Sequence, residues 1–138
     1  MITLEEVRLI HSAVIEFDRI NNPADYVPGE RYIAIIESML EYRMSEEKSV
    51  YQNAAIALHT IASRHAFNNG NKRTAGATAL ILLKNEGIHF TINEEAKTNF
   101  IIDIATPQKN ITVETVEEWL KKNTEVDSKL DIIGNGSA

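Results

Sequence analysis

The residues with the clearest chemical potential lie in one short segment, His65–Ala75, which reads HAFNNGNKRTA. His65 follows the end of an expected helix, so its imidazole can face a cleft rather than the core. Because the unperturbed pKa of histidine is about 6.5, this side chain suits the work of a general base near neutral pH. The segment therefore indicates proton transfer on a bound substrate.

The residues after His65 have the composition of an anion-binding turn. The run Asn68–Asn71 leads into the next expected helix, and Gly70 allows the backbone angles of a tight turn. Free N–H groups and the dipole at a helix N-terminus attract anions. The positive charges of Lys72 and Arg73 lie in the first helical turn, where the positive end of the helix dipole repels them. A bound phosphate would offset this repulsion.

Each of these features also has an ordinary structural reading. A lone histidine at a helix end is more often structural than catalytic, an Asn-Asn-Gly-Asn run is often a plain turn, and Lys-Arg at a helix start is often only solvated. The spacing is not that of a Walker A loop, because Lys72 lacks the glycine that precedes the lysine there. The residues alone leave a phosphate site and a structural turn both open.

Composition and charge narrow the class of protein. The chain has 138 residues, no cysteine and ordinary hydrophobic content, which predicts one globular domain without disulfides or thiolate metal sites. The N-terminus carries no signal-peptide pattern, and no apolar stretch approaches the roughly 20 residues of a membrane span. We therefore expect a cytoplasmic protein that does not bind membranes. A net charge of −6 argues against a nucleic-acid surface, while the cluster of Arg64, Lys72 and Arg73 suits a small anion.

Periodicity and capping signals predict an all-α bundle. Thr3 and Glu6 form a capping-box start for a helix that ends at Asn21-Asn22-Pro23. Its expected buried stripe is Leu4, Val7, Ile10, Val14 and Phe17. Further helices are expected over about 30–42, 49–64, 71–85, 93–105 and 112–120, with a strand-like stretch over 88–92. The polar stretch 43–48 forms either a turn or a small flap hairpin. One domain over 1–123 and a flexible tail over 124–138 complete the expected layout.

The segment HAFNNGNKRTA resembles the signature of the Fic/Doc superfamily, H-x-F-x-[DE]-G-N-x-R, and its GNKRTA ending resembles the Doc (death-on-curing) branch. The likeness is densest from about Ile56 to Phe90. It implies a Fic-like helical bundle and transfer of a nucleotide-derived group to a protein hydroxyl, with ATP and Mg²⁺ as cofactors.

The resemblance also implies roles for single residues. His65 falls on the catalytic histidine that deprotonates the attacking hydroxyl, and Phe67 on the aromatic residue that anchors the loop. Lys72 occupies a position where Doc-type proteins have lysine. The implied phosphate or nucleotide contacts are Asn68, Gly70, Asn71, Lys72 and Arg73.

Two positions depart from the family pattern. Gly76 stands where nucleotide-adding members have a second arginine, which favours transfer of a phosphate over transfer of AMP. Asn69 stands where the family commonly has an acid that helps to bind Mg²⁺, and an amide oxygen is a weaker ligand for that cation. A metal role for Asn69 is therefore in question, and the nucleotide phosphates and water would supply most of the Mg²⁺ ligands.

The resemblance thus implies a Doc-like toxin that phosphorylates translation elongation factor Tu and is bound by a small, Phd-like antitoxin. A Fic-type AMP or nucleotidyl transferase and a catalytically silent binding module are the alternatives. Three other histidines are set aside, because no pair has the His-x-x-x-His spacing of a metal site. His59 lies six residues before His65, which places the two far apart around the helix axis and favours a structural or surface role for His59. His11 and His89 have no partner pattern.

Overall fold

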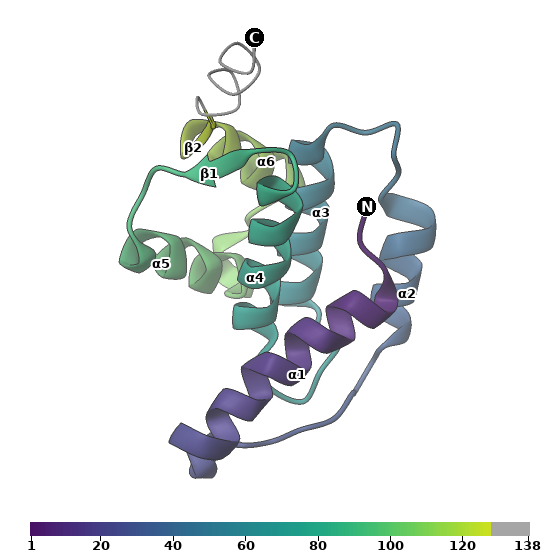
Figure 1. The fold of residues 1–138 in the computed structure, drawn as a ribbon, viewed down its shortest axis with the longest axis vertical. Coiled ribbons are helices and arrows are strands. Elements are labelled where there is room, and N and C mark those ends of the chain that lie inside the picture. The colour runs from purple at the N-terminus through teal and green to yellow at the C-terminus, as the bar shows by residue number, and fades with distance from the viewer. Residues whose placement is uncertain (128–138) are drawn as a thin grey trace, which may run out of the picture.

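The computed structural model describes residues 1–127 and is built mostly of helices (Figure 1). The helices are α1 (Leu4–Asn21), α2 (Ala34–Ser38), α3 (Val50–Ser63), α4 (Asn71–Lys84), α5 (Glu94–Ile104) and α6 (Val113–Lys122). Two strands, β1 (Ile88–Phe90) and β2 (Thr124–Val126), and three short helical segments, η1 (Pro23–Asp25), η2 (Met39–Arg43) and η3 (Pro107–Lys109), complete the order. The predicted all-α bundle is confirmed. Within residues 1–127, no helix is both long and apolar enough to cross a membrane.

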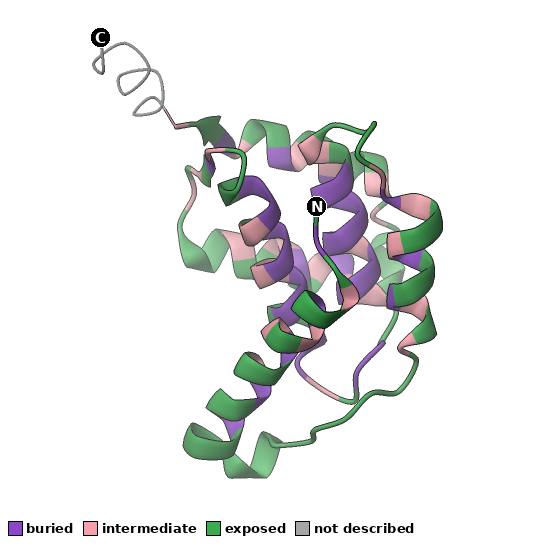
Figure 2. Ribbon diagram, turned by 45° about the vertical axis from the view of Figure 1, so that its right-hand side comes forward, coloured by how far each residue is buried: buried purple, intermediate pink, exposed green. Residues whose placement is uncertain are grey.

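Helix α3 forms the centre of the bundle, with α4 and α6 packed along it. Figure 2 shows α3 and the facing part of α4 as mostly buried. Small side chains on both helices, such as Ala57 on α3 and Ala79 on α4, are fully buried. Because such residues let two backbones approach closely, the segments on either side of the loop 64–70 are held firmly together.

The helix starts follow the predicted capping residues. The Thr3 side-chain oxygen accepts a hydrogen bond from the Glu6 backbone N–H, and the Glu6 carboxylate accepts one from the Thr3 backbone N–H. Asn93 and Thr112 cap α5 and α6 through their side-chain oxygens. These caps satisfy backbone donors that the first helical turn leaves free, which is why the starts could be predicted from sequence.

The buried face of α1 agrees with the predicted stripe only in part: Val7 is buried and Leu4 and Ile10 pack against the core, as predicted. Val7, His11, Ile15 and Asp18 face inward, whereas the side chain of Phe17 is 57% exposed. Two of the four inward residues are polar: His11 bonds to Asn69 in the loop that follows α3, and Asp18 bonds to Arg73 in the first turn of α4. An apolar periodicity could not reveal a face whose contacts are partly polar.

Helix α2 starts later than predicted, because the residues before it pair with the loop. The backbone N–H groups of Arg31 and Tyr32 both donate to the Ala66 carbonyl, at 2.8 and 2.9 Å. Glu30 and Phe67 form an isolated antiparallel bridge. These contacts hold residues 30–32 outside the helix, which begins at Ala34 and continues through the π-helical η2.

Two further segments settle questions that the sequence left open. Arg43 ends η2, and residues 44–48 form a turn and no strand, with Ser45 bonded through both backbone groups to the Asn53 side chain. The small hairpin instead pairs β1 with β2, and Ile88 lies opposite Val126. Residues 124–126, which were expected to belong to a flexible tail, form this second strand. Residues 128–138 lie outside the described part of the chain.

Candidate active site

The loop between α3 and α4 turns sharply at two residues with left-handed backbone angles, His65 (φ 55°) and Gly70 (φ 77°). Histidine is one of the few non-glycine types that adopt this conformation readily. A Cβ atom at Gly70 would lie 3.0 Å from Cγ1 of Val14 on α1. Glycine at 70 therefore serves both the turn and the close approach of the loop to α1.

Phe67 anchors the loop in the interior, as the family resemblance implies. Its side chain is 1% exposed, and its ring stacks on the His11 ring with centroids 3.7 Å apart. The Asn71 side chain accepts from the Phe67 N–H at 3.1 Å and donates to the Phe67 carbonyl at 2.9 Å. Asn71 is thus committed by its side chain to closing the loop, and its backbone N–H remains the group that can face a ligand.

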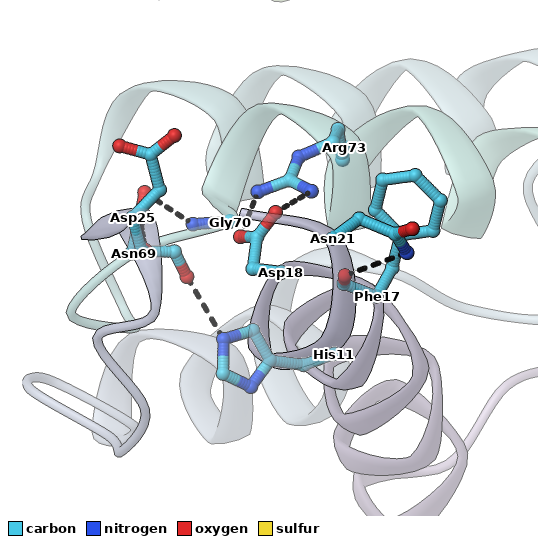
Figure 3. A network of polar contacts seen from close by, with 8 residues as sticks. All are labelled: His11, Phe17, Asp18, Asn21, Asp25, Asn69, Gly70 and Arg73. Carbon is cyan, nitrogen blue, oxygen red and sulfur yellow. Dashed lines mark hydrogen bonds and ion pairs between the residues drawn. The ribbon is translucent and has the colours of Figure 1, made fainter. Parts of the chain in front are cut away.

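His11 holds the loop from the α1 side. Its Nε2 lies 2.9 Å from the Asn69 carbonyl oxygen, as Figure 3 shows. Because a carbonyl only accepts, this bond requires the proton on Nε2. Burial lowers the pKa of His11 below its ordinary value, although the bond to Asn69 opposes that change. A neutral ring that donates from Nε2 satisfies both conditions.

The Asn69 side chain hydrogen-bonds to η1 and to its own loop. Its Nδ2 donates to the Asp25 carbonyl at 2.7 Å, and its Oδ1 accepts from the Gly70 N–H at 2.8 Å (Figure 3). Among residues 1–127, no group of three acidic, histidine or cysteine side chains is placed to hold a metal ion. With both ends of its amide hydrogen-bonded, the Asn69 side chain does not fit the role of a metal ligand in this structure.

Arg73 is oriented by a carboxylate on α1. Its two terminal nitrogens donate to the two oxygens of Asp18 at 2.9 and 2.6 Å (Figure 3). Asp18 is 2% exposed, while the Arg73 side chain is 47% exposed. The hydrogen bonds from Arg73 lower the pKa of Asp18, and the same bonds raise the pKa of Arg73. A two-point contact of this kind fixes the plane of the guanidinium and leaves one of its edges open.

The outward side of the loop borders a cleft of about 620 Å³. All seven predicted site residues line it: His65, Asn68, Asn69, Gly70, Asn71, Lys72 and Arg73. Arg64, which belongs to the predicted basic cluster, does not. Neither the His65 ring nor the Lys72 ammonium group has a hydrogen-bond partner among the described residues. The Asn68 side chain, by contrast, donates to the Pro28 carbonyl at 3.0 Å.

The start of α4 leaves backbone donors available at this cleft. Its N-cap residue, Gly70, has no side chain, so the helix begins without a side-chain cap. The first backbone N–H groups of a helix carry partial positive charge, and here they lie beside Lys72 and Arg73. The arrangement can bind a phosphate group within reach of a histidine.

Sequence reasoning missed the two α1 residues that support this site, His11 and Asp18. They lie seven residues apart, which places them on one face of a helix two turns apart. Two polar residues at that spacing within an apolar face were the available signal. His59, which was set aside, bonds to the Ile111 carbonyl at 2.9 Å and is structural, as its position relative to His65 predicted.

Comparison with known proteins agrees with the geometry. The family model described as Fic/DOC family matches residues 1–83, which include α1, α3, the loop and nearly all of α4. No curated protein matches the chain. The matched region is more than half of the sequence and holds every residue assigned to the site above, and the chain belongs to the Fic/DOC family.

Proposed function

We propose that this protein transfers the terminal phosphate of ATP to a serine or threonine hydroxyl of another protein, as Doc-type members of the family do. Members of the Fic/DOC family typically transfer nucleotide-derived groups to proteins, and they generally bind ATP and a divalent cation. The observation that carries the proposal is that His65 and the uncapped start of α4 border one cleft.

The chemistry assigned to these residues is a single displacement. The Nε2 or Nδ1 atom of His65 accepts the proton of the target hydroxyl, whose oxygen attacks the terminal phosphorus. The bond between that phosphorus and the oxygen bridging it to ADP breaks, and ADP leaves. Lys72, Arg73 and the first N–H groups of α4 balance the negative charge on the phosphoryl oxygens.

Gly76 favours phosphate transfer over AMP transfer. The position lacks the second arginine of nucleotide-adding members. A Cβ atom at Gly76 would lie 3.0 Å from Cδ1 of Ile101 on α5. Since that atom is the end of a side chain, a shift of a few tenths of an ångström would relieve the contact, and the preference for phosphate transfer rests on the missing arginine alone.

The finer parts of the proposal concern partners. By resemblance to the Doc branch, the target is translation elongation factor Tu, and a small Phd-like antitoxin restrains the toxin. An unpaired apolar face supports binding of a partner segment: on α1 the side chains of Leu9, Phe17 and Ile20 are 69%, 57% and 63% exposed. An amphipathic helix is the kind of segment that covers such a face.

The decisive experiment follows the two ends of the ATP phosphate chain. Purified protein is incubated with elongation factor Tu and with ATP labelled at either the γ or the α phosphate. We expect γ label on the target and no α label. His65→Ala should lose the transfer, whereas His89→Ala, which changes an exposed histidine on β1, should retain it.

Each other result selects a different function. Transfer of the α label would establish a nucleotidyl transferase and reject the phosphotransferase. Equal label with wild type and His65→Ala would remove the histidine from the mechanism. If elongation factor Tu stays unlabelled and another protein, supplied in a cell extract, gains γ label, the phosphotransferase activity is supported and elongation factor Tu is rejected as its target.

A catalytically silent binding module is the second candidate, and Asn69 is the observation that favours it. A neutral amide, bonded at one end to Asp25 and at the other to Gly70, replaces the family's usual acid. In that case wild type transfers no label, and expression of wild type and His65→Ala affects growth equally. Recovery of transfer in Asn69→Asp would then identify the amide as the cause.

A further inference from the structure

The ion pair between Asp18 and Arg73 joins the interior of the fold to the cleft (Figure 3). The Asp18 carboxylate accepts from both terminal nitrogens of Arg73, and Asp18 is 2% exposed. The Arg73 side chain is half exposed and lines the cleft. The buried partner can therefore act on a bound phosphate only through the arginine.

Arg73 stays on Asp18 when a ligand binds. A carboxylate that is nearly closed off from water would be left as an unpaired buried charge if the guanidinium turned away, and such a charge is strongly unfavourable. A guanidinium has five N–H donors, of which Asp18 engages two. Arg73 therefore meets a phosphate with the donors that Asp18 leaves free, and in the plane that Asp18 sets.

The position of the carboxylate is fixed by other contacts of α1. Two turns before Asp18 on the same face, the His11 ring lies 2.9 Å from the Asn69 carbonyl oxygen. Between these two residues, α1 packs so closely on the loop that a Cβ atom at Gly70 would lie 3.0 Å from Cγ1 of Val14. Asp18 thus reaches Arg73 from a support that contacts the loop at two further points.

The same pair lowers the net positive charge that the site offers to a phosphate. The charges of Asp18 and Arg73 offset each other, and the carboxylate lies directly behind the guanidinium, where it repels an anion bound in front. Lys72, which also lines the cleft, has no ion-pair partner among residues 1–127. The attraction of an anion to this end of the cleft therefore comes mainly from Lys72 and the start of α4.

We propose that Asp18 is a positioning residue that makes Arg73 act through the direction of its hydrogen bonds rather than through its charge, so that the pair weakens phosphate binding while it speeds phosphate transfer. This inference rests on the proposed function, because it concerns the transfer step. Aligned donors favour the transferring phosphoryl group in its transition state, whereas a free cation attracts substrate and transition state alike.

Asp18→Asn separates these two effects, because asparagine has nearly the same shape, no charge and a single acceptor oxygen. The kcat for transfer of γ label from ATP to protein in a cell extract should fall about 10- to 100-fold, since Arg73 is no longer held in its plane. The dissociation constant of inorganic tripolyphosphate, measured by titration calorimetry on the full chain, should decrease about two- to fivefold, since the repulsion is lost. Added salt should reduce the gain in affinity but not the loss of kcat.

Asp25→Asn is the matched control. It removes an exposed carboxylate on η1 whose charge also acts on Arg73, while both hydrogen bonds from Arg73 to Asp18 remain. Asn69 bonds to the backbone carbonyl of residue 25, which the substitution retains. The control should leave kcat unchanged. An equal fall of kcat in Asp25→Asn and Asp18→Asn would show that loss of charge is sufficient, and it would overturn the positioning role.

Asp18→Ser, which removes the charge and needs less space, is a second variant that should show the same two changes. Circular dichroism checks that each variant is folded. A fall in both kcat and tripolyphosphate affinity would mean that Asp18 only maintains the fold, and unchanged kcat would mean that Arg73 needs no support. Either result overturns the inference while the proposed function stands. Absence of γ label with wild type overturns both.

Discussion

The two sides of the loop between α3 and α4 contrast sharply. On the inward side, the Phe67 backbone, the Asn69 side chain and the Asn71 side chain all have hydrogen-bond partners within the fold. On the outward side, His65 and Lys72 have none among the described residues. The hydrogen-bonding groups named on the inward face of the loop are thus paired, whereas those on the outward face are free among the described residues.

This difference separates the residues that build the site from those that would act in it. Inward contacts fix the loop before any ligand arrives, so little ordering is required on binding. Outward groups keep their hydrogen-bonding capacity for a ligand. Substitutions on the two sides should therefore affect different measurements, and the following predictions test that division.

The largest effect is expected on the outward side, in catalysis alone. His65→Asn should lower the rate of phosphate transfer about 10²- to 10⁴-fold, because a general base is lost. Asparagine tolerates the left-handed backbone at this position, so the melting temperature should stay near that of wild type. A large drop in melting temperature would show that His65 also belongs to the scaffold.

Phe67→Ala should produce the largest effect on stability. Removal of a fully buried phenylalanine ring costs about 3–5 kcal/mol of unfolding free energy, measured by urea denaturation. Phe17→Ala, on the exposed side of α1, should cost less than about 0.5 kcal/mol. Similar losses in the two variants would contradict the assignment of Phe67 as the anchor.

Asn71→Ala tests the polar part of the inward side. It leaves the buried N–H and carbonyl of Phe67 without partners, which costs about 1–3 kcal/mol. Asn68→Ala removes a single exposed bond to Pro28 and should have a smaller effect on the same urea midpoint. A larger drop in the urea midpoint for Asn68→Ala than for Asn71→Ala would contradict this expectation.

The smallest effect concerns pH. Because burial lowers the pKa of folded His11, the unfolded chain takes up a proton first as pH falls below about 6.5, and stability decreases. For one proton, the free energy of unfolding cannot change by more than about 1.4 kcal/mol per pH unit. Glu30, whose pKa is lowered by its hydrogen bonds with Arg8, remains ionised over this range.

His11→Phe should remove this slope between pH 7 and 5. Phenylalanine keeps a ring for stacking on Phe67, and a neighbouring cavity of about 370 Å³ gives it room. Urea midpoints of wild type and variant at both pH values measure the difference. Parallel losses in the two proteins would mean that another group carries the pH dependence.

Local signals predicted the helices and the outward part of the site. Thr3, Asn93 and Thr112 cap helices through neighbours three residues away, so sequence alone reveals them. The motif HAFNNGNKRTA likewise identified every residue of the loop that lines the cleft. In both cases the chemistry and its partners lie within a few residues of each other.

The supporting contacts could not be predicted because their partners are distant in sequence. His11 bonds to Asn69 across 58 positions, and Asp18 bonds to Arg73 across 55. The same holds for β2, whose pairing with β1 depends on the path of the chain through α5 and α6. Long-range pairing of polar groups leaves no periodic trace in the sequence.

The span of the Asp18–Arg73 pair has a consequence for how the protein is made. A ribosome synthesises α1 first, and the partner that completes its buried face appears only when α4 follows. Contacts of such sequence separation form late, because closing a long loop costs entropy before the contact repays it. The proposed activity therefore requires α4 as well as α1, and a stalled or truncated product carrying α1 alone would lack the loop and the helix start to which the phosphate is assigned.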